Sequence, residues 1–421
     1  MIHFWELLFW LGVGWLAYVY FGYALCLWAL GAFRPFRGEK KENYFPKVSV
    51  LISARNEEKD IEWKVRETLS WDYPADALEL LIASDASEDR TDGILESIRD
   101  PRLRYTRIEP RVGKNDALNR LAKMATGEIL FFTDANSHVG LDSLKNMVRH
   151  FADERVGCVT GIEHTIEDPG KGSVEAGAKA YLEYEAVINR MEATLGSVLV
   201  CDGSIFCMRR KLFSDLDPDL ANDLETPVRI GSYHLALLFE PQAQSFEKST
   251  SSMREEFNRR RRICGQGILG LWRLRSSLKG IRAWQFISRK LMRWLCLVPL
   301  LGVLAASIAL ASRPFFSFLL GVQVICCAFA VIGAIQSRGH KQAGRLFSLP
   351  LFFMLVNVAA IWGLVESCRG RRYATWEIPS LSRGGSEAFG SPVGHGTPKT
   401  IVLDVSQDGA VGSAEVGRDG R

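Results

Sequence analysis

The chain has long apolar stretches near both ends and a central region in which short apolar runs alternate with polar loops. Leu7–Leu30 carries no charged residue and is long enough to cross a hydrocarbon core of about 30 Å. Three further apolar stretches follow the central region: Trp294–Ser312, Phe315–Gln336 and Leu346–Val365. This pattern predicts an N-terminal transmembrane helix within residues 1–33 and about three C-terminal transmembrane helices within residues 294–366.

The charges beside these stretches predict their orientation. Only His3 is basic before the first stretch, whereas four basic residues follow it directly: Arg34, Arg37, Lys40 and Lys41. The positive-inside rule then places the N-terminus outside and the central region in the cytoplasm, as in a multi-pass protein of a bacterial inner membrane. Residues 281–293 are expected at the membrane interface. We expect four crossings, which leave the C-terminus outside even though the basic residues 369, 371 and 372 lie there; a segment that enters without crossing is the alternative.

Five short runs in residues 48–280, most of them apolar, read as strands, with helical patterns between most of them. The runs are Val48–Ser53, Glu79–Ala83, Arg102–Arg107, Ile129–Thr133 and Val156–Gly161. Alternating strands and helices predict an α/β fold with a mostly parallel sheet and helices on both faces. Ligands bind to such sheets beyond the carboxyl ends of the strands, so polar residues just after these runs are candidates for a site.

Composition adds a few limits. The 421 residues suffice for a soluble domain together with membrane segments, and the net charge of +4 excludes little. No nucleic-acid partner is expected. The nine cysteines form no CxxC pair and no metal-finger spacing, which favours a reducing compartment without a disulfide framework. Residues 383–421 are rich in glycine, serine and charge, and we expect a disordered tail there.

The most informative chemistry lies in two neighbouring segments, Gly113–Asn119 and Thr133–Asn136. Asp134 and Asn136 follow a buried strand and offer two oxygen ligands for Mg²⁺ or Mn²⁺, which would take its other ligands from substrate phosphates and water. Lys114 can place its ammonium group against a diphosphate, since Gly113 lets the backbone come close. These features predict an enzyme that uses a nucleotide-activated donor beside a membrane.

Seven segments, in order, resemble the successive motifs of family 2 glycosyltransferases of the GT-A fold. They are Val48–Glu58, Ser84–Thr91, Gly113–Asn119, Gly127–Asn136, Asp202–Ser204, Asn222–Asp223 and Arg259–Ile263. The late apolar block and Trp376–Pro379 also resemble the membrane-bound bacterial branch, which builds polysaccharides or glycolipids. The resemblance implies a nucleotide-diphosphate-sugar donor and a lipid-linked or saccharide acceptor. Membrane lipids and enzymes of a polysaccharide pathway are the other expected partners.

The resemblance also implies roles on the donor side. Asp85 would bind the nucleotide base and ribose, with Asn56 and Glu57 in the same wall. A helix-capping role is the alternative for Asp85, because capping residues surround it. Lys114 would contact the diphosphate, and Asp134 would bind both metal and donor.

On the acceptor side, Asp223 would be the general base of an inverting transfer, with Glu225 as the alternative. Arg262 would steady the leaving diphosphate. The basic run that contains it could equally be a patch for anionic lipid. Three further residues would shape the acceptor pocket: Asp202, Gly203 and Ser204.

The chain departs from the family pattern at four positions. Asn136 replaces an aspartate, which predicts weaker metal binding. Asn222 replaces a glutamate, Arg259 replaces a glutamine and Ile263 replaces a tryptophan. The lost tryptophan favours transfer of one or a few sugars over a processive polysaccharide synthase. A third hypothesis, a catalytically inactive membrane subunit that binds nucleotide sugar, rests on these four substitutions together.

Overall fold

The computed structural model describes residues 1–166, 175–248, 253–338 and 344–373. The expected tail at residues 383–421 and the segment Trp376–Pro379 lie outside the described residues.

The central region folds around one mixed sheet, which has eight strands in the described residues. Their spatial order is β3-β2-β1-β4-β7-β6-β8-β5. The strands are β1 (Val48–Ala54), β2 (Leu78–Asp85), β3 (Leu103–Ile108), β4 (Ile129–Phe132), β5 (His138–Val139), β6 (Val156–Ile166), β7 (Phe206–Arg209) and β8 (Ala236–Lys248).

The five predicted strands are confirmed as β1, β2, β3, β4 and β6. β1 pairs in parallel with β2 and β4, and β2 pairs in parallel with β3, so this half of the sheet is parallel as expected. In the second half β7, which was not predicted, lies antiparallel between β4 and β6, while β6 pairs in parallel with β8, so the sheet is mixed. β7 is only four residues long, and such a short run gives almost no periodic signal.

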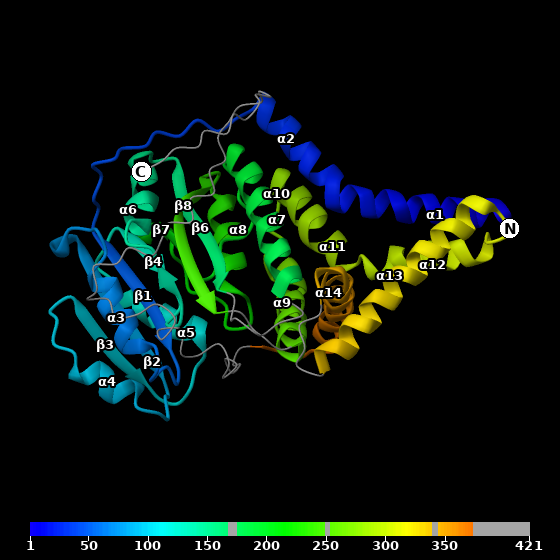
Figure 1. Ribbon diagram of the computed structural model, residues 1–421. Coiled ribbons are helices and arrows are strands. Elements are labelled where there is room, and N and C mark those ends of the chain that lie inside the picture. The colour runs from blue at the N-terminus through cyan, green and yellow to red at the C-terminus, as the bar shows by residue number, and fades with distance from the viewer. Residues whose placement is uncertain (167–174, 249–252, 339–343, 374–421) are drawn as a thin grey trace, which may run out of the picture.

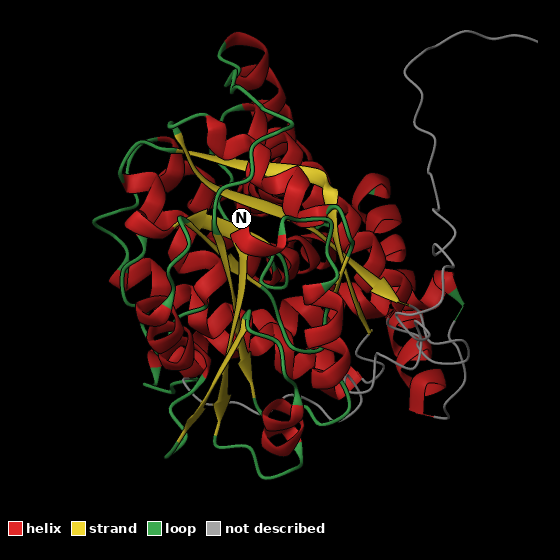
Figure 2. Cartoon of the chain, turned by 90° about the vertical axis from the view of Figure 1, so that its left-hand side faces the viewer, coloured by secondary structure: helices red, strands yellow, loops and turns green. Residues whose placement is uncertain are grey.

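Helices cover both faces of the sheet, as Figure 2 shows. Side chains alternate along β1, so that Val50 joins one apolar core while Leu51 joins the other. Ile61 of α3 packs into the first core, and Leu118 of α5 packs into the second. The helices of this region are α3 (Ile61–Leu69), α4 (Thr91–Ser97), α5 (Lys114–Met124), α6 (Ser143–Val148), α7 (Glu175–Thr194), α8 (Asn222–Ser232) and α9 (Met253–Arg273).

Three helices among the described residues are long and apolar enough to cross a membrane: Ile2–Phe33, Pro314–Ser337 and Leu346–Cys368. The first consists of α1 (Ile2–Ala17), a π-helical turn and α2 (Tyr23–Phe33), and the others are α13 (Pro314–Arg338) and α14 (Arg345–Cys368). They contain three of the four apolar stretches seen in the sequence.

The fourth stretch is not one straight helix. α10 (Ile281–Gln285), a π-helical segment and α11 (Met292–Trp294) lead to α12 (Leu297–Ala309), and the two parts meet at an angle of 55°. Pro299 has no N–H to bond the Leu295 carbonyl, which weakens the helix where the chain bends. Figure 1 shows α1, α12 and α13 extending together away from the sheet.

A buried ionic network joins α7 to α2 and to the bent segment Ile281–Ala309. Glu192 of α7 is fully buried and accepts hydrogen bonds from Arg289 Nη1 at 2.6 Å, Tyr23 Oη at 2.5 Å and the Leu199 N–H at 2.9 Å. Arg289 also donates to Glu185 at 2.7 Å. Because each charge has several partners, the desolvation penalty of burial is offset.

We expect Glu192→Gln to lower the free energy of unfolding by about 3 kcal/mol or more, because the buried Arg289 loses its closest carboxylate. Denaturant unfolding in detergent measures this. The matched control is Glu62→Gln, which removes an exposed pair with Arg66 and changes stability by about 0.5 kcal/mol. Equal losses of unfolding free energy in the two variants would contradict the expected contribution of the network.

Candidate active site

The loops after β1 and β2 are tied to each other at the carboxyl edge of the sheet. Asn56 has a φ of 54°, a left-handed conformation that asparagine tolerates better than most residues. Its Oδ1 accepts the N–H of Glu88 at 2.8 Å, and its own N–H donates to Ser87 Oγ at 3.1 Å. Glu57 is buried beneath this edge, and its N–H donates to Thr91 Oγ1 at 2.8 Å. The two loops therefore form one wall.

Asp85 ends β2 and shapes the start of α5. Its two carboxylate oxygens accept the N–H groups of Val112 at 2.7 Å and Gly113 at 2.8 Å. Gly113 has a φ of 94°, a conformation that side chains rarely adopt, so glycine is required there. Asp85 thus fixes the residue that precedes Lys114. It binds backbone N–H groups just before α5, which resembles the alternative capping role but acts on a neighbouring segment.

Lys114 and Asp134 meet at this edge. Lys114 Nζ lies 2.5 Å from Asp134 Oδ1, and the two side chains are 28% and 30% exposed. An arriving ligand can therefore reach both groups. Lys114, from the Gly113–Asn119 segment, and Asp134, which follows β4, form an ion pair.

Asn136 is held by a carboxylate. Its Nδ2 donates to Glu247 Oε1 at 2.9 Å, which leaves the amide oxygen as the acceptor of that side chain. An aspartate at position 136 would set two carboxylates at this distance, and one of them would then have to take a proton. The departure of Asn136 from the family pattern therefore has a local cause in Glu247.

A buried lysine supports the turn that carries Asp134 and Asn136. Lys64 of α3 is fully buried, and its Nζ donates to the Ser137 carbonyl at 2.5 Å and to Thr133 Oγ1 at 3.2 Å. Glu67, one helical turn later, accepts the Val139 N–H at 2.9 Å. Burial lowers the pKa of Lys64 and raises that of Glu67 to about 7. Nothing in the sequence pattern singled out this pair.

The residues present fit a hard cation for which the protein supplies only some of the ligands. In the described part of the chain, no three histidine, cysteine, aspartate or glutamate side chains form a group able to hold a metal ion. Asp134 and the amide oxygen of Asn136 are the two oxygen ligands on offer. Such a pair suits Mg²⁺ or Mn²⁺, which commonly complete their coordination with phosphate oxygens and water.

Asp223 lies at the start of α8, beside the Asp202–Ser204 turn. The Cys201 N–H donates to the Asp223 carbonyl at 2.9 Å, and a Cβ on Gly203 would lie 3.6 Å from Asp223 Oδ2. Burial raises the pKa of Asp223, and the cations of Lys114, Lys290 and Arg262 counteract that rise. The predicted base and part of the predicted acceptor pocket are therefore in contact.

The loop before Asp223 is held by the asparagines of the Gly113–Asn119 segment. Asn119 exchanges two hydrogen bonds with the Leu216 backbone, at 3.0 and 2.7 Å. Asn115 Nδ2 donates to the carbonyls of Asp217 at 2.7 Å and Leu220 at 2.9 Å. One short segment thus places both Lys114 and the approach to Asp223.

Acidic groups and arginines line the other side of the site. Burial, together with nearby Asp202, raises the pKa of Glu163 to about 8, and burial raises that of Glu247 to about 8. Arg259 faces Glu163 at 3.9 Å. Burial next to Arg259 lowers the pKa of Arg262 to about 10, and Asp223 and Asp134 act in the opposite direction. Arg259 and Arg262 thus both face the carboxylates of the site.

The other acids near Asp223 are engaged elsewhere. Both oxygens of Glu225 accept the Asp217 N–H, at 3.2 and 3.0 Å, and Glu225 also pairs with Arg229. Asp217 and Asp219 pair with Arg273. Because Glu225 is fully buried among these partners, its position favours a structural role over that of an alternative base.

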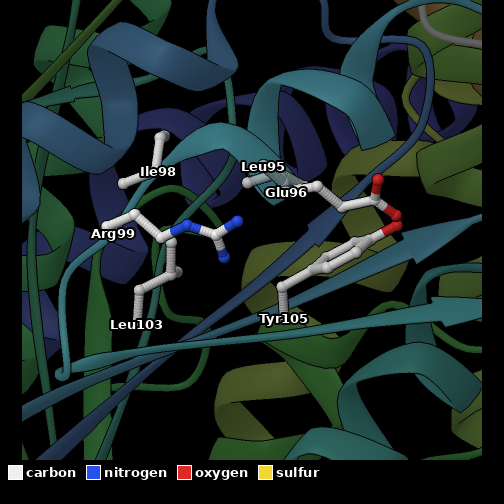
Figure 3. A pocket seen from close by; sticks show the side chains of 6 residues that line it. All are labelled: Leu95, Glu96, Ile98, Arg99, Leu103 and Tyr105. Carbon is white, nitrogen blue, oxygen red and sulfur yellow. The ribbon is translucent and has the colours of Figure 1, made fainter.

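A separate pocket of about 430 Å³ lies between α4 and the edge strand β3. Figure 3 shows its lining, in which the Glu96 carboxylate points toward the Tyr105 hydroxyl. None of the residues discussed above lines it, so it is not part of this site.

With the geometry established, comparison with known proteins adds the family. A family profile described as "Glycosyl transferase family 2" matches residues 49–217, which include Asp85, Lys114 and Asp134. Residues 49–217 therefore contain a glycosyltransferase family 2 domain.

Relatives of this glycosyltransferase share modest identity with it. A beta-monoglucosyldiacylglycerol synthase from Synechocystis is 27% identical over 44% of the chain and 40% of the relative. The synthase of the same name from Trichormus variabilis is 23% identical over 81% of the chain and 73% of the relative. A poly-beta-1,6-N-acetyl-D-glucosamine synthase from Staphylococcus epidermidis is 24% identical over 47% of the chain and 48% of the relative. The chain thus matches less than half the length of two of these relatives.

A solved structure shares the fold of the glycosyltransferase. The mannosyltransferase PcManGT from Pyrobaculum calidifontis, in complex with GDP-Man and Mn²⁺, superimposes with a TM-score of 0.63. The alignment covers 84% of this chain and 99% of that chain at 21% identity. The GT-A fold predicted for this glycosyltransferase is confirmed.

We expect Asp85→Asn to loosen the start of α5. An amide has one oxygen where the carboxylate has two, so one of the two backbone N–H groups loses its acceptor. The expected loss is about 2 kcal/mol, with faster hydrogen exchange at Val112 and Gly113. Asp76→Asn, on an exposed turn, is the control and should change neither. Unchanged exchange at residues 112 and 113 would contradict the structural role of Asp85.

Proposed function

We propose that this protein is a membrane-bound, inverting glycosyltransferase. It moves a sugar from a nucleotide-diphosphate-sugar donor to a lipid-linked or saccharide acceptor, in glycolipid or polysaccharide synthesis. The observation that carries the proposal is the set of charges around one sheet edge. Lys114 and Asp134 are paired there, and both act electrostatically on Asp223, as does Arg262.

The donor would bind over the first half of the sheet. The wall formed by Asn56 and the loop after β2 takes the nucleoside, with Asp85 holding the Gly113 backbone in place. Glu57 supports this wall from below. Lys114 contacts the diphosphate and offsets its negative charge.

The transfer itself needs a base on the acceptor side. The Asp223 carboxylate takes the proton of the acceptor hydroxyl, whose oxygen attacks the anomeric carbon. The bond from that carbon to the diphosphate oxygen breaks, and the leaving diphosphate carries the electron pair. Lys114 and Arg262 stabilise the charge that develops there. Gly203 leaves space beside Asp223 for the acceptor, and Asp202 and Ser204 border the same space.

Mg²⁺ or Mn²⁺ would supply a further positive charge at the diphosphate. Asp134 and Asn136 would hold it, with a neutral amide in place of a second carboxylate. The mannosyltransferase that shares the fold was solved with Mn²⁺, which supports this cofactor class. Mg²⁺ and Mn²⁺ are both compatible with two oxygen ligands.

The names of the relatives support the proposed acceptor classes, since one describes a diacylglycerol glycolipid and another a polysaccharide. The apolar helices support a place in a membrane, which we propose to be a bacterial inner membrane with the catalytic region in the cytoplasm. Ile263, in the place of the family's tryptophan, supports transfer of one or a few sugars.

The central test uses purified protein in detergent with Mg²⁺ or Mn²⁺, a panel of nucleotide sugars and membrane lipid extract. Release of nucleoside diphosphate from one donor is expected, and EDTA or Asp134→Ala should abolish it. Asp223→Asn should lower transfer by about 10²–10⁴ while nucleotide binding persists.

The control for Asp223→Asn is Asp215→Asn, an exposed carboxylate that is paired with Lys123. It should keep full activity. Nucleotide binding without transfer from any donor would overturn the proposal in favour of an inactive subunit, and a ladder of long products would identify a processive synthase.

The acid side of the pH–rate profile should report Asp223. Burial raises its pKa above the ordinary aspartate value, so kcat/KM falls as the pH decreases through that raised pKa. Lys290 stabilises the carboxylate, so Lys290→Gln raises the pKa of Asp223 further and shifts the acid limb to higher pH. Lys279→Gln, which changes an exposed lysine, should leave the limb in place. A shift to lower pH in Lys290→Gln would contradict this assignment.

A further inference from the structure

The N-terminus and the turn between α12 and α13 lie together, far from the sheet. Glu6 pairs with Arg313, and the rings of Phe9 and Phe316 are 5.0 Å apart. Figure 1 shows both segments at the end of the molecule that is farthest from the strands. We call this end the far face.

The C-terminal ends of α2 and α13 lie on the side of the catalytic region. We call this side the near face. Gly31 of α2 packs against Thr194 of α7. Gly333 of α13 lies about 28 Å from Pro314 at the helical rise of about 1.5 Å per residue, which is close to the thickness of a hydrocarbon core. A Cβ on Gly333 would lie 2.7 Å from the Phe347 carbonyl, so α14 begins at the near face.

The rest of α14 also stays at the near face. Phe352 lies directly against Gly177 of α7, and Ala360 joins the apolar cluster of Leu220 and Leu224. The middle of α14 is therefore in contact with the catalytic region. In a membrane-spanning helix, this part would be surrounded by lipid or by other membrane helices.

The C-terminal end of α14 contacts the catalytic region as well. Gly363 packs against the Arg261 carbonyl so closely that a Cβ would not fit. Glu366 lies 3.5 Å from Arg261, and just beyond the helix Arg372 lies 3.5 Å from Asp219. Both ends of α14 are therefore on the same side.

We propose that α14 does not cross the membrane but lies along its near surface, against α7 and α9. The described chain then crosses three times, through α1–α2, the bent segment Ile281–Ala309 and α13. This replaces the fourth crossing expected from hydropathy, and the inference does not depend on the reaction.

The charge distribution agrees with this arrangement. The basic residues 369, 371 and 372 now fall on the same side as Arg34, Arg37 and Lys40, as the positive-inside rule requires. Arg313 is the basic residue left in the short turn at the far face.

The partner of the outer side of α14 is the lipid of the near leaflet. Along the C-terminal half of α14 the large exposed apolar side chains Val358, Trp362 and Val365 share one face of the helix, while Leu346 and Leu349 are exposed in its first turns. α13, itself apolar enough to span a membrane, packs beside α14, so this surface continues directly from a membrane segment. Exposed Arg369 and Arg371 at its end match anionic headgroups, as in helices that lie in an interface.

Cysteine labelling in spheroplasts tests the topology. Cys26, Cys326 and Cys327 are exposed and are replaced by alanine, leaving the exposed Cys368 at the end of α14. An impermeant maleimide should label Cys368 only after the membrane is permeabilised.

Two variants that also carry Cys368→Ser calibrate the sides. Ser312→Cys, in the turn at the far face, should react in intact spheroplasts. Lys279→Cys, in the catalytic region, should react only after permeabilisation. Labelling of Cys368 under the same conditions as Ser312→Cys would overturn the proposal, because a crossing helix would bring position 368 to the far face.

A depth profile by spin labelling tests the lipid contact of α14 in the full-length protein in vesicles. Nitroxides at positions 358, 362 and 365, which share one face of α14, should report one shallow depth, measured by the ratio of oxygen to nickel-chelate accessibility. Positions 318, 325 and 332 of α13 provide the matched control and should pass through a maximum near 325. A deep maximum at position 358, or aqueous exposure at all three α14 positions, would overturn the proposal.

Discussion

The Glu192 carboxylate connects the apolar helices to the candidate active site, and the arrangement of both depends on it. It binds Arg289 from the bent membrane segment, Tyr23 from α2 and the Leu199 N–H at the start of the chain that leads to Asp202. Two residues beyond Leu199, the Cys201 N–H binds the Asp223 carbonyl. A fully buried charge needs these partners in fixed places, since any unmet partner would leave it unpaired in a low-dielectric interior. The same requirement fixes the position of Asp223, the proposed base, relative to the bent apolar segment and α2.

The site gathers several carboxyl groups, and their charge bears on two of its departures from the family pattern, at positions 136 and 259. Glu163, Asp202 and Glu247 are half-buried around the site, and their desolvation raises the pKa of each, that of Asp202 to about 6. Another aspartate at position 136 would add repulsion beside Glu247, whereas asparagine donates a hydrogen bond to it. Arg259, in place of a neutral glutamine, adds a cation opposite Glu163. The two substitutions change the local charge in the same direction.

The sequence was enough to predict the strands of the proposed donor side, because β1, β2 and β4 are largely apolar and buried along almost their whole length. It was not enough for β8, whose run contains Glu240 and Pro241 and whose pairing with β6 shifts register. Asp85 and Asp134 were placed by their positions after strands. The support of Lys64 for Ser137 joins residues far apart in the chain, and a lysine among apolar helix positions carries no signal of that contact. Hydropathy likewise predicts that a helix has apolar surroundings, but it does not predict whether lipid or protein provides them.

α9 shows why those neighbours matter for the chemistry. One side of this helix carries Arg259 toward Glu163, while Gly265 on another side leaves room for Tyr373, which follows α14. The close approach of Gly363 to the Arg261 carbonyl means that α9 cannot shift outward without displacing α14. Arg262 therefore sits on a helix clamped between the sheet and α14. If lipid supports α14, as we propose, the bilayer is part of the clamp that sets the position of Arg262. In the proposed reaction, the membrane would then help to set how strongly Arg262 stabilises the leaving diphosphate.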